Sequence, residues 1–310
     1  MTSPEAARPG MLFVVGAARS GTTYLVDVLG DLFDFGMGPE GHFVLQLARR
    51  LGRYGDLAEV RNMTRLLEDV RAASTLSIIR NEWPAHERFD VTLDELRARV
   101  YEPSFAAVVY ATYRCIADHL GKANVASKNP AYTLHLPLLE SLFPGRARYV
   151  NLVRDGRDVA LSSLRLPWGQ NTVYACARSW ARCIESARTF ERAIGGDRFL
   201  NVRYEDLVQD PEATLARLEA FLGMPLAAAT RDAFIAQARG SDLAANFGKW
   251  KSAMSARDIE RFEAVAGVAL DAWGYERTCP APRVGLVEAA WFEGEELARK
   301  VRATLRARGR

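Results

Sequence analysis

The sequence predicts an α/β protein with a P-loop-like central parallel sheet flanked by helices. Short apolar runs rich in β-branched and aromatic residues recur along the chain, helical patterns separate them, and the first run leads directly into a glycine-bounded turn and a helix. Alternation of strands and helices favours parallel pairing, so ligands are expected beyond the carboxyl ends of the strands. At 310 residues, the chain is long enough for one extended domain of this kind.

Residues 11–25, MLFVVGAARSGTTYL, join the first strand to the first helix. Residues 12–15 are predicted to form a buried strand, Gly16 and Gly21 bound a tight turn, and residues 22–33 have helical apolar spacing. This succession aims backbone N–H groups at a phosphate, although an ordinary connecting turn would have the same outline. The residues expected to hold the anion are Arg19, Ser20, Gly21, Thr22 and Thr23.

The turn differs from the Walker loop, GxxxxGK[ST], in its charge. Gly16 and Gly21 have the Walker spacing, but Thr22 stands where the Walker lysine would be, and a cation comes earlier, at Arg19. The loop therefore suits one phosphate at the helix N-terminus and a second anionic group beside Arg19 better than a magnesium-bound triphosphate.

The composition is that of an ordinary globular protein, and its slight positive charge suits an anionic ligand. The net charge is +3, and lysines and arginines are dispersed rather than gathered in blocks, so no nucleic-acid partner is predicted. Apolar runs fall far short of the ~20 residues that a membrane span needs. The first ten residues, MTSPEAARPG, do not resemble a signal peptide, and we expect a cytoplasmic location.

Four cysteines, Cys115, Cys176, Cys183 and Cys279, show no spacing typical of metal ligands. Cys176 and Cys183 are seven residues apart, which places them on one helical face, and core packing is the favoured interpretation. The sequence therefore predicts no metal site.

A helical insert of about residues 42–120 follows the first helix. Residues 35–41, FGMGPEG, are expected to be a loop because they are rich in glycine and proline. Residues 42–80 have a helical pattern, and residues 92–120 are helical again, beginning at a Thr92 or Asp94 cap with Glu95 behind it.

The later strands are predicted at residues 125–127, 149–153 and 199–202, with helices near 132–143, 156–166, 172–194 and 211–222. A cation follows each of the first two strands, Lys128 and Arg154, and Ser162 comes eight residues after Arg154. A guanidinium fork and a hydroxyl suit a phosphate group. The alternative is a surface ion pair between Arg154 and Asp155, with Ser162 as a small helix residue.

The C-terminal third adds further candidates. Tyr204 lies in the segment YEDLV, and residues 246–251, NFGKWK, place Lys249 and Lys251 beside a glycine and Trp250. A structural tyrosine and solvated lysines are the alternatives. Ser241 is a further candidate, and residues 255–275 are expected to form a capped helix. Residues 284–310 form a basic amphipathic helix, so we divide the chain into a domain of residues 1–280 and a helical extension of residues 281–310.

These motifs resemble those of the sulfotransferases that use 3'-phosphoadenosine 5'-phosphosulfate (PAPS). The segment RSGTT, residues 19–23, is similar to the family's loop for the 5'-phosphosulfate. The resemblance implies that Arg154 and Ser162 hold the 3'-phosphate and that Tyr204 lies against the adenine. It also implies that residues 246–251 close over the nucleotide, with Lys249 and Lys251 on phosphate.

The resemblance extends to the catalytic residues of tyrosylprotein sulfotransferases. It implies that Lys128, in the segment Lys-Asn-Pro and twenty-six residues before Arg154, meets the charge on the leaving oxygen together with Arg19. Glu40, twenty-one residues beyond Arg19, would be the base, and His42 is its rival because cytosolic sulfotransferases use histidine. Unlike the tyrosylprotein enzymes, the chain has no cysteine next to Glu40 or Lys128.

The predicted function is transfer of the sulfuryl group from PAPS, without a metal, to a hydroxyl or amine of a small molecule, lipid or peptide. The helical insert would cover the acceptor side. A kinase-like enzyme with a P-loop and a non-catalytic nucleotide-binding module are the alternatives. Three interpretations of the C-terminal helix remain open: packing on the protein's own domain, a peripheral membrane contact, and a homodimer contact.

Overall fold

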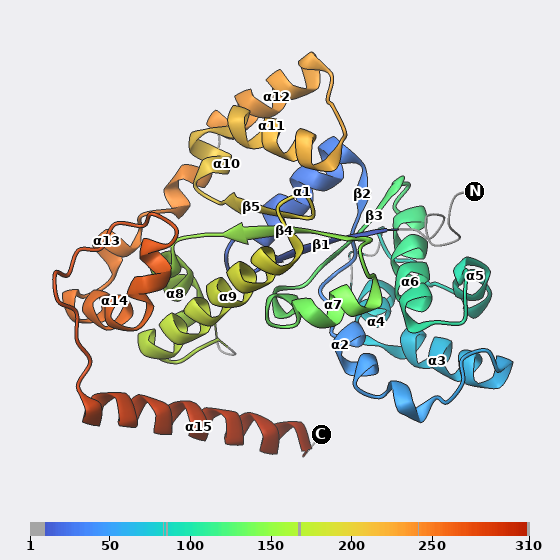
Figure 1. Cartoon of the computed structure of the whole chain (residues 1–310), viewed down its shortest axis with the longest axis horizontal. Coiled ribbons are helices and arrows are strands. Elements are labelled where there is room, and N and C mark those ends of the chain that lie inside the picture. The colour runs from blue at the N-terminus through green and yellow to red at the C-terminus, as the bar shows by residue number, and fades with distance from the viewer. Residues whose placement is uncertain (1–9, 83, 85, 167–168, 241, 309–310) are drawn as a thin grey trace.

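The computed structural model describes residues 10–82, 84, 86–166, 169–240 and 242–308. Its centre is a five-stranded sheet in the order β2-β3-β1-β4-β5, and every neighbouring pair is parallel (Figure 1). The predicted parallel sheet is therefore confirmed. The strands are β1 (Met11–Gly16), β2 (Phe35–Gly36), β3 (Asn124–Lys128), β4 (Ala147–Val153) and β5 (Phe199–Arg203).

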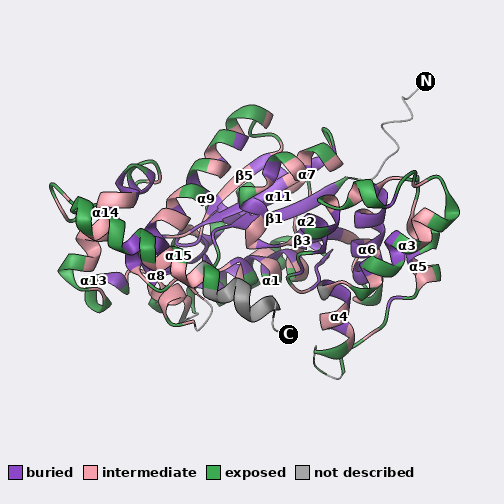
Figure 2. Ribbon diagram, turned by 90° about the horizontal axis from the view of Figure 1, so that it is seen from below, coloured by how far each residue is buried: buried purple, intermediate pink, exposed green. Residues whose placement is uncertain are grey.

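Helices cover both faces of the sheet. Because strand side chains alternate, Leu12 and Val14 pack on one face, while Phe13 packs on the other. The first face is covered by α1 (Thr22–Phe33), α11 (Pro211–Leu222) and α12 (Ala228–Arg239). The second is covered by α6 (Phe105–His119), α7 (Leu136–Leu142) and α9 (Val173–Ile194). The sheet is thus buried at the middle of the molecule (Figure 2).

The insert is helical, as predicted, but it is more divided than the sequence suggests. Thr92 caps α5 with Glu95, whose backbone N–H donates to the Thr92 hydroxyl over 3.1 Å. The prediction of one helical stretch over residues 92–120 was wrong, because the chain is extended at the Ser104 N-cap, where α6 starts. The helices of the insert are α2 (Phe43–Ala48), α3 (Val60–Ala72), α4 (Ser74–Asn81), α5 (Leu93–Arg99) and α6.

The prediction that residues 35–41 form a loop throughout was also wrong at its start. Phe35 and Gly36 pair with Asn124 and Val125 as the short edge strand β2. A Cβ atom on Gly36 would lie 2.5 Å from Ala117 of α6, so only glycine fits there. A strand of two residues is too short to show a strand pattern in the sequence. β2 forms because β3 pairs with it and α6 packs against it.

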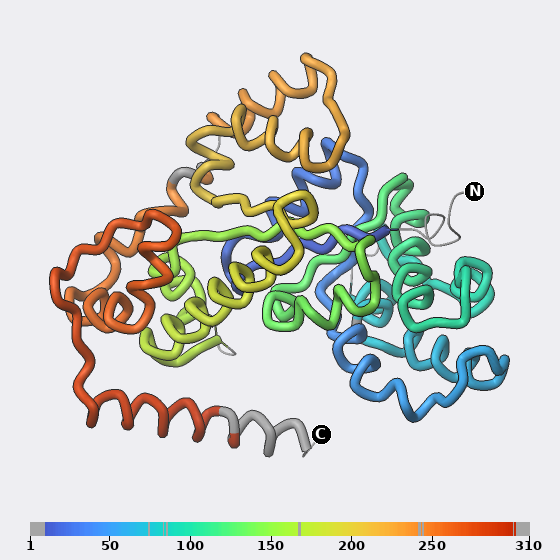
Figure 3. The backbone as a smooth tube through the Cα atoms, viewed as in Figure 1, coloured from blue at the N-terminus to red at the C-terminus, as the bar shows by residue number. Residues whose placement is uncertain are grey.

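The C-terminal part packs on α9. A third apolar cluster joins α8 (Gly156–Leu164), α9 and α14 (Ala256–Asp271), and Ser255 caps α14, as predicted. The chain then turns back as α15 (Leu286–Arg308) (Figure 3). Its Phe292 stacks on Tyr174 of α9 with ring centroids 5.1 Å apart. Two short helices complete this part, α10 (Asp206–Gln209) and α13 (Trp250–Ala253). Within the described ranges, no helix is both long enough and apolar enough to cross a membrane.

Candidate active site

A cavity of about 650 Å³ lies at the carboxyl ends of β1, β3, β4 and β5. This is the edge of the sheet at which the sequence predicts a ligand. Most of the predicted site residues line this single cavity: Arg19, Gly21, Thr22, Thr23, Glu40, His42, Arg154, Ser162, Tyr204 and Lys249.

The turn after β1 contains backbone conformations with positive φ, which favour glycine. Arg19 has a φ of 73° and Gly21 a φ of 93°, and a Cβ on Gly21 would lie 2.6 Å from the Tyr204 ring. No described side chain caps α1, so the N–H groups of its first turn are available at the cavity wall. Ser20 differs from its neighbours, because its side chain is fully buried and does not line the cavity.

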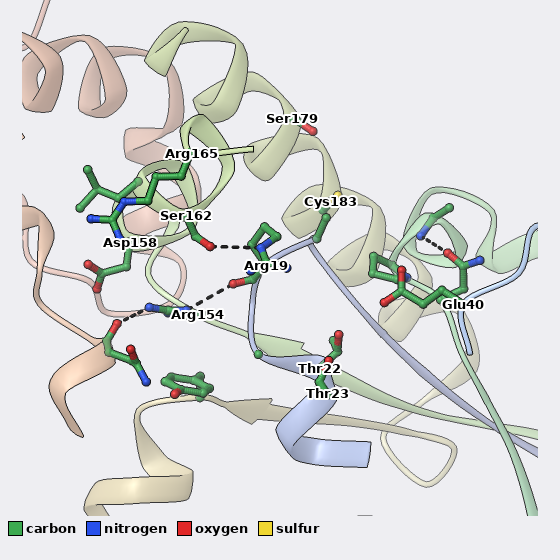
Figure 4. A pocket seen from close by; sticks show the side chains of 18 of the residues that line it. Arg19, Thr22, Thr23, Glu40, Arg154, Asp158, Ser162, Arg165, Ser179 and Cys183 are labelled. Atoms are coloured by element: carbon green, nitrogen blue, oxygen red, sulfur yellow. Dashed lines mark hydrogen bonds between the residues drawn. The ribbon is translucent and has the colours of Figure 1, made fainter. Parts of the chain in front are cut away.

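Arg154 and Arg19 meet at one end of the cavity. Arg154 donates from Nη1 to the Arg19 carbonyl oxygen over 3.3 Å, and Arg19 Nε donates to Ser162 Oγ over 3.1 Å (Figure 4). The Arg154 guanidinium also lies 4.8 Å from the centroid of the Tyr204 ring. The alternative ion pair between Arg154 and Asp155 does not form, since Asp155 instead pairs with Arg157 over 2.8 Å.

The segment after η4 (Asp242–Asn246) closes this end of the cavity and is held by α8. The Asp158 carboxylate accepts the backbone N–H groups of Gly248 over 2.6 Å and of Trp250 over 3.0 Å. Burial raises the pKa of Asp158, while these two hydrogen bonds oppose the shift. Trp250 is buried and therefore anchors the segment.

The two predicted lysines of this segment differ. Lys249 lines the cavity, whereas Lys251 is exposed, lies 5.7 Å from the Trp250 ring centroid and does not line the cavity. Ser241 lies outside the described residues.

Glu40 lines the other end of the cavity and forms an ion pair with Lys128, which does not itself line the cavity. The Lys128 side chain is 10% exposed and that of Glu40 is 45% exposed. The next residue, Asn129, donates to the Gly41 carbonyl oxygen over 2.8 Å and lies 3.4 Å from His42 Nδ1. The end of β3 therefore fixes the loop that carries both candidate bases.

Several lining residues escaped the sequence analysis. Ser179 and Cys183 are four residues apart and so lie on one face of α9. Burial raises the pKa of Cys183 to about 11, so this cysteine stands in the cavity wall as a thiol. The spacing of four residues predicts that Cys183 and Ser179 share one face of a helix. It does not predict that this face lines the cavity. The others are Ala18, Asn129, Pro130, Ala131, Leu134, Asp158, Leu161, Arg165 and Asn246.

The helical insert contributes little to the cavity wall. Among the described residues, His42 is the only lining residue from residues 42–120. Leu134 of η3 (Pro130–Leu134) and the α9 face form the wall near Glu40 instead. No cluster of three or more histidine, cysteine or acidic residues that could hold a metal ion occurs in the described part of the chain.

Fold and site together define the class. A parallel sheet, a glycine turn that leads into an uncapped helix, and two arginines that converge there make a P-loop-like α/β protein with a site for an anionic ligand. The chain belongs to the sulfotransferase family, whose sequence model matches residues 9–228.

Individual relatives agree with this membership. The chain is 25% identical over 221 residues to a protein-tyrosine sulfotransferase of Drosophila melanogaster, covering 69% of this chain and 38% of that protein. It is 24% identical over 176 residues to the omega-hydroxy-beta-dihydromenaquinone-9 sulfotransferase Stf3 of Mycobacterium bovis, covering 52% of this chain and 44% of the relative. The chain thus spans less than half the length of these curated relatives.

A solved structure shares the fold. The sulfotransferase domain from the curacin biosynthetic pathway superposes with a TM-score of 0.55 at 16% identity, covering 87% of this chain and 99% of that domain. This similarity concerns the fold alone.

Proposed function

We propose that the protein transfers the sulfuryl group of PAPS to a hydroxyl or amine acceptor. The observation that carries the proposal is the convergence of Arg19, Arg154 and Ser162 at one end of a single cavity, with Glu40 at the other, where it pairs with Lys128 behind the cavity wall. A nucleotide with a ribose phosphate and a phosphosulfate needs two separate anion sites, and the cavity offers both. The named relatives act on a tyrosine and on an omega-hydroxyl, which favours a hydroxyl acceptor.

In this proposal, the donor lies between α1 and α8. The N–H groups of the first turn of α1 and the side chains of Thr22 and Thr23 hold the 5'-phosphosulfate. Arg154 and Ser162 hold the 3'-phosphate, and Lys249 approaches the nucleotide from the segment that Asp158 fixes. The Tyr204 ring lies close to Gly21 of the turn, lines the cavity and packs against the adenine.

The chemical step is an in-line displacement. The acceptor oxygen or nitrogen forms a bond to sulfur, the bond from sulfur to the bridging oxygen breaks, and the electron pair leaves on the 5'-phosphate of 3',5'-ADP. Glu40 takes the acceptor proton, and Lys128 with Arg19 stabilises the charge that develops on the leaving oxygen. The substrates would insert between Glu40 and Lys128 and separate their ion pair. His42 is the alternative base.

The test is a set of ligand titrations against thermal stability. We expect 3',5'-ADP and PAPS to stabilise the protein without magnesium, by about 2.7 kcal/mol at a hundredfold excess over the dissociation constant. Stabilisation by ATP alone, and only with magnesium, would indicate a kinase-like enzyme and exclude the proposal. Nucleotide binding without release of 3',5'-ADP from PAPS across a panel of phenols, alcohols and amines would indicate a binding module.

A further inference from the structure

The cavity continues beyond the catalytic residues into a second hollow of about 310 Å³ between α9 and α15. Leu134 and Ser179 line both spaces, so the two are contiguous. On this side the wall includes Arg299 and Leu297 of α15, a helix that lies beyond the residues matched by the family model. This groove between α9 and α15 therefore belongs to the particular chain rather than to the family's shared core.

The charges in the groove are not balanced. Arg178 is neutralised by Glu293, over 3.0 Å, and lies 4.0 Å from Glu296. Among the described residues, neither Arg182 nor Arg299 has a carboxylate within ion-pair distance, although both line the groove. Arg299 donates from Nη2 to the neutral amide oxygen of Gln170 over 3.1 Å, and its Nε is buried without a partner.

Three arginines and two glutamates line the groove, both glutamates lie beside Arg178, and the net positive charge that Arg182 and Arg299 leave favours an anion. A guanidinium presents a planar fork that matches a carboxylate or a phosphate, and a buried N–H without a partner costs free energy until a ligand satisfies it. The anionic groups of PAPS are already matched by Arg19, Arg154 and the first turn of α1. Arg182 and Arg299 are therefore not needed for the donor.

We propose that the groove between α9 and α15 binds the acceptor, and that Arg182 and Arg299 hold an anionic group that the acceptor carries apart from its nucleophile. This inference rests on the proposed sulfotransferase function. Leu134 and Leu297 contact the carbon skeleton between the two ends, and the nucleophile reaches the main cavity past Ser179 and Leu134. The acceptor class is thus a hydroxyl compound with a carboxylate or a phosphate.

The experiment compares three matched probes in the presence of 3',5'-ADP. These are hydroxyphenylpropionate, its methyl ester, and the analogue in which a phosphate ester replaces the carboxylate. Binding is measured by calorimetry, so the result does not depend on turnover. We expect the two anionic probes to bind about tenfold more tightly than the methyl ester, and the tighter of the two identifies the anion. Equal binding of all three, including failure of all to bind, would overturn the proposal.

Variants then assign the preference to the groove. Arg182→Ala with Arg299→Ala should abolish the preference while leaving the affinity for 3',5'-ADP unchanged, and lysine at both positions should restore part of it. Arg192→Ala is the matched control, since this exposed arginine of α9 does not line the groove. A preference that persists in the double variant would refute the assignment. If the wild-type protein does not bind 3',5'-ADP, the sulfotransferase proposal itself is refuted.

Discussion

Arg154 links three parts of the site through one side chain. It donates to the carbonyl oxygens of Arg19 and Asn246, and its guanidinium lies over the Tyr204 ring, 4.8 Å from the ring centroid. Its guanidinium thus stands fixed at the cavity wall before any nucleotide binds. A charged donor held in place in this way loses little conformational freedom when it binds a phosphate.

We expect Arg154→Ala to raise the dissociation constant of 3',5'-ADP about 10- to 100-fold, because a hydrogen bond to a charged group contributes about 1.5–3 kcal/mol. Calorimetric titration measures the change. Arg61→Ala, at an exposed position of α3, is the control and should bind as the wild type does. An unchanged affinity in Arg154→Ala would contradict the assignment of the 3'-phosphate site.

Glu40 is the second residue whose role can be tested alone. We expect Glu40→Gln to lower kcat about 100- to 10,000-fold, since the amide cannot accept the acceptor proton, while 3',5'-ADP affinity stays within twofold. Steady-state kinetics and titration give the two quantities. Glu68→Gln, at an exposed position of α3, should leave both unchanged. A fully active Glu40→Gln enzyme would transfer the role of base to His42.

At the scale of elements, the connection between α8 and α14 depends on a buried charge cluster. The Arg157 side chain is 1% exposed and contacts Asp155 and Glu263, each over 2.8 Å. Its guanidinium also lies 3.5 Å from the centroid of the Trp250 ring. This arginine therefore supports both the helix packing and the segment that closes on the cavity.

We expect Arg157→Met to lower the free energy of unfolding by about 3–5 kcal/mol, because it leaves two buried carboxylates without their partner. It should also weaken 3',5'-ADP binding, since Trp250 loses its support. Urea denaturation with and without the nucleotide measures both effects. Arg192→Met is the exposed control on α9. A loss below about 1 kcal/mol would show that the cluster is replaceable.

The cap of α5 gives the element its own pH dependence. The backbone N–H of Thr92, which donates to the Glu95 carboxylate over 2.7 Å, holds the pKa of Glu95 below its usual value. Because the pKa is lower in the folded state, this contribution is complete above the pKa of the unfolded chain. It is lost as the pH falls through the folded-state pKa.

Glu95→Gln should therefore cost about 0.3–1 kcal/mol of unfolding free energy at pH 7, and the difference from wild type should shrink as the pH falls through the lowered pKa of Glu95. Chemical denaturation across this pH range tests the expectation. Glu68→Gln should show no comparable pH dependence. A difference between wild type and Glu95→Gln that stays constant with pH would mean that the charge is not responsible.

At the scale of the whole molecule, α15 packs on α9 and α14, and its Arg299 shares a small hollow with Arg19 at the edge of the donor site. It is attached through Phe292 on Tyr174 and through Glu288, which accepts from Arg261 over 2.7 Å. The residues that surround the proposed donor come from the turn after β1, from α1 and α8, from the ends of β4 and β5, and from the segment after η4. Donor binding and α15 docking should therefore be separable.

We expect Phe292→Ala to accelerate amide hydrogen exchange in α15 while the affinity for 3',5'-ADP stays within twofold. The reason is that α15 can detach locally without unfolding the sheet. Val287→Ala, at a position of α15 that is 87% exposed, is the control and should leave exchange unchanged. A loss of nucleotide binding in Phe292→Ala would show that α15 supports the donor site as well.

The sequence could predict the fold and many of the residues that line the cavity, because both depend on local chemistry. Apolar runs predicted four of the five strands, β1, β3, β4 and β5, and the rule that parallel strands present ligands at their carboxyl ends placed Arg19, Lys128 and Arg154 at one edge. Ser20 shows the limit of this reasoning. Its residue type suits a phosphate, but the backbone of the turn, with Arg19 at a φ of 73°, buries its side chain beneath the loop.

What the sequence determined by itself was the parallel α/β fold, the helix caps and the cations that follow the strands, because periodicity and residue type specify these within a few neighbouring positions. Only the tertiary structure decided that Glu40 pairs with Lys128, that Asp158 holds the segment of Trp250, and that α9 and α15 form a groove next to the cavity. Each of these contacts joins residues far apart in the chain. Their geometry follows from how helices pack on the sheet, which no local pattern encodes.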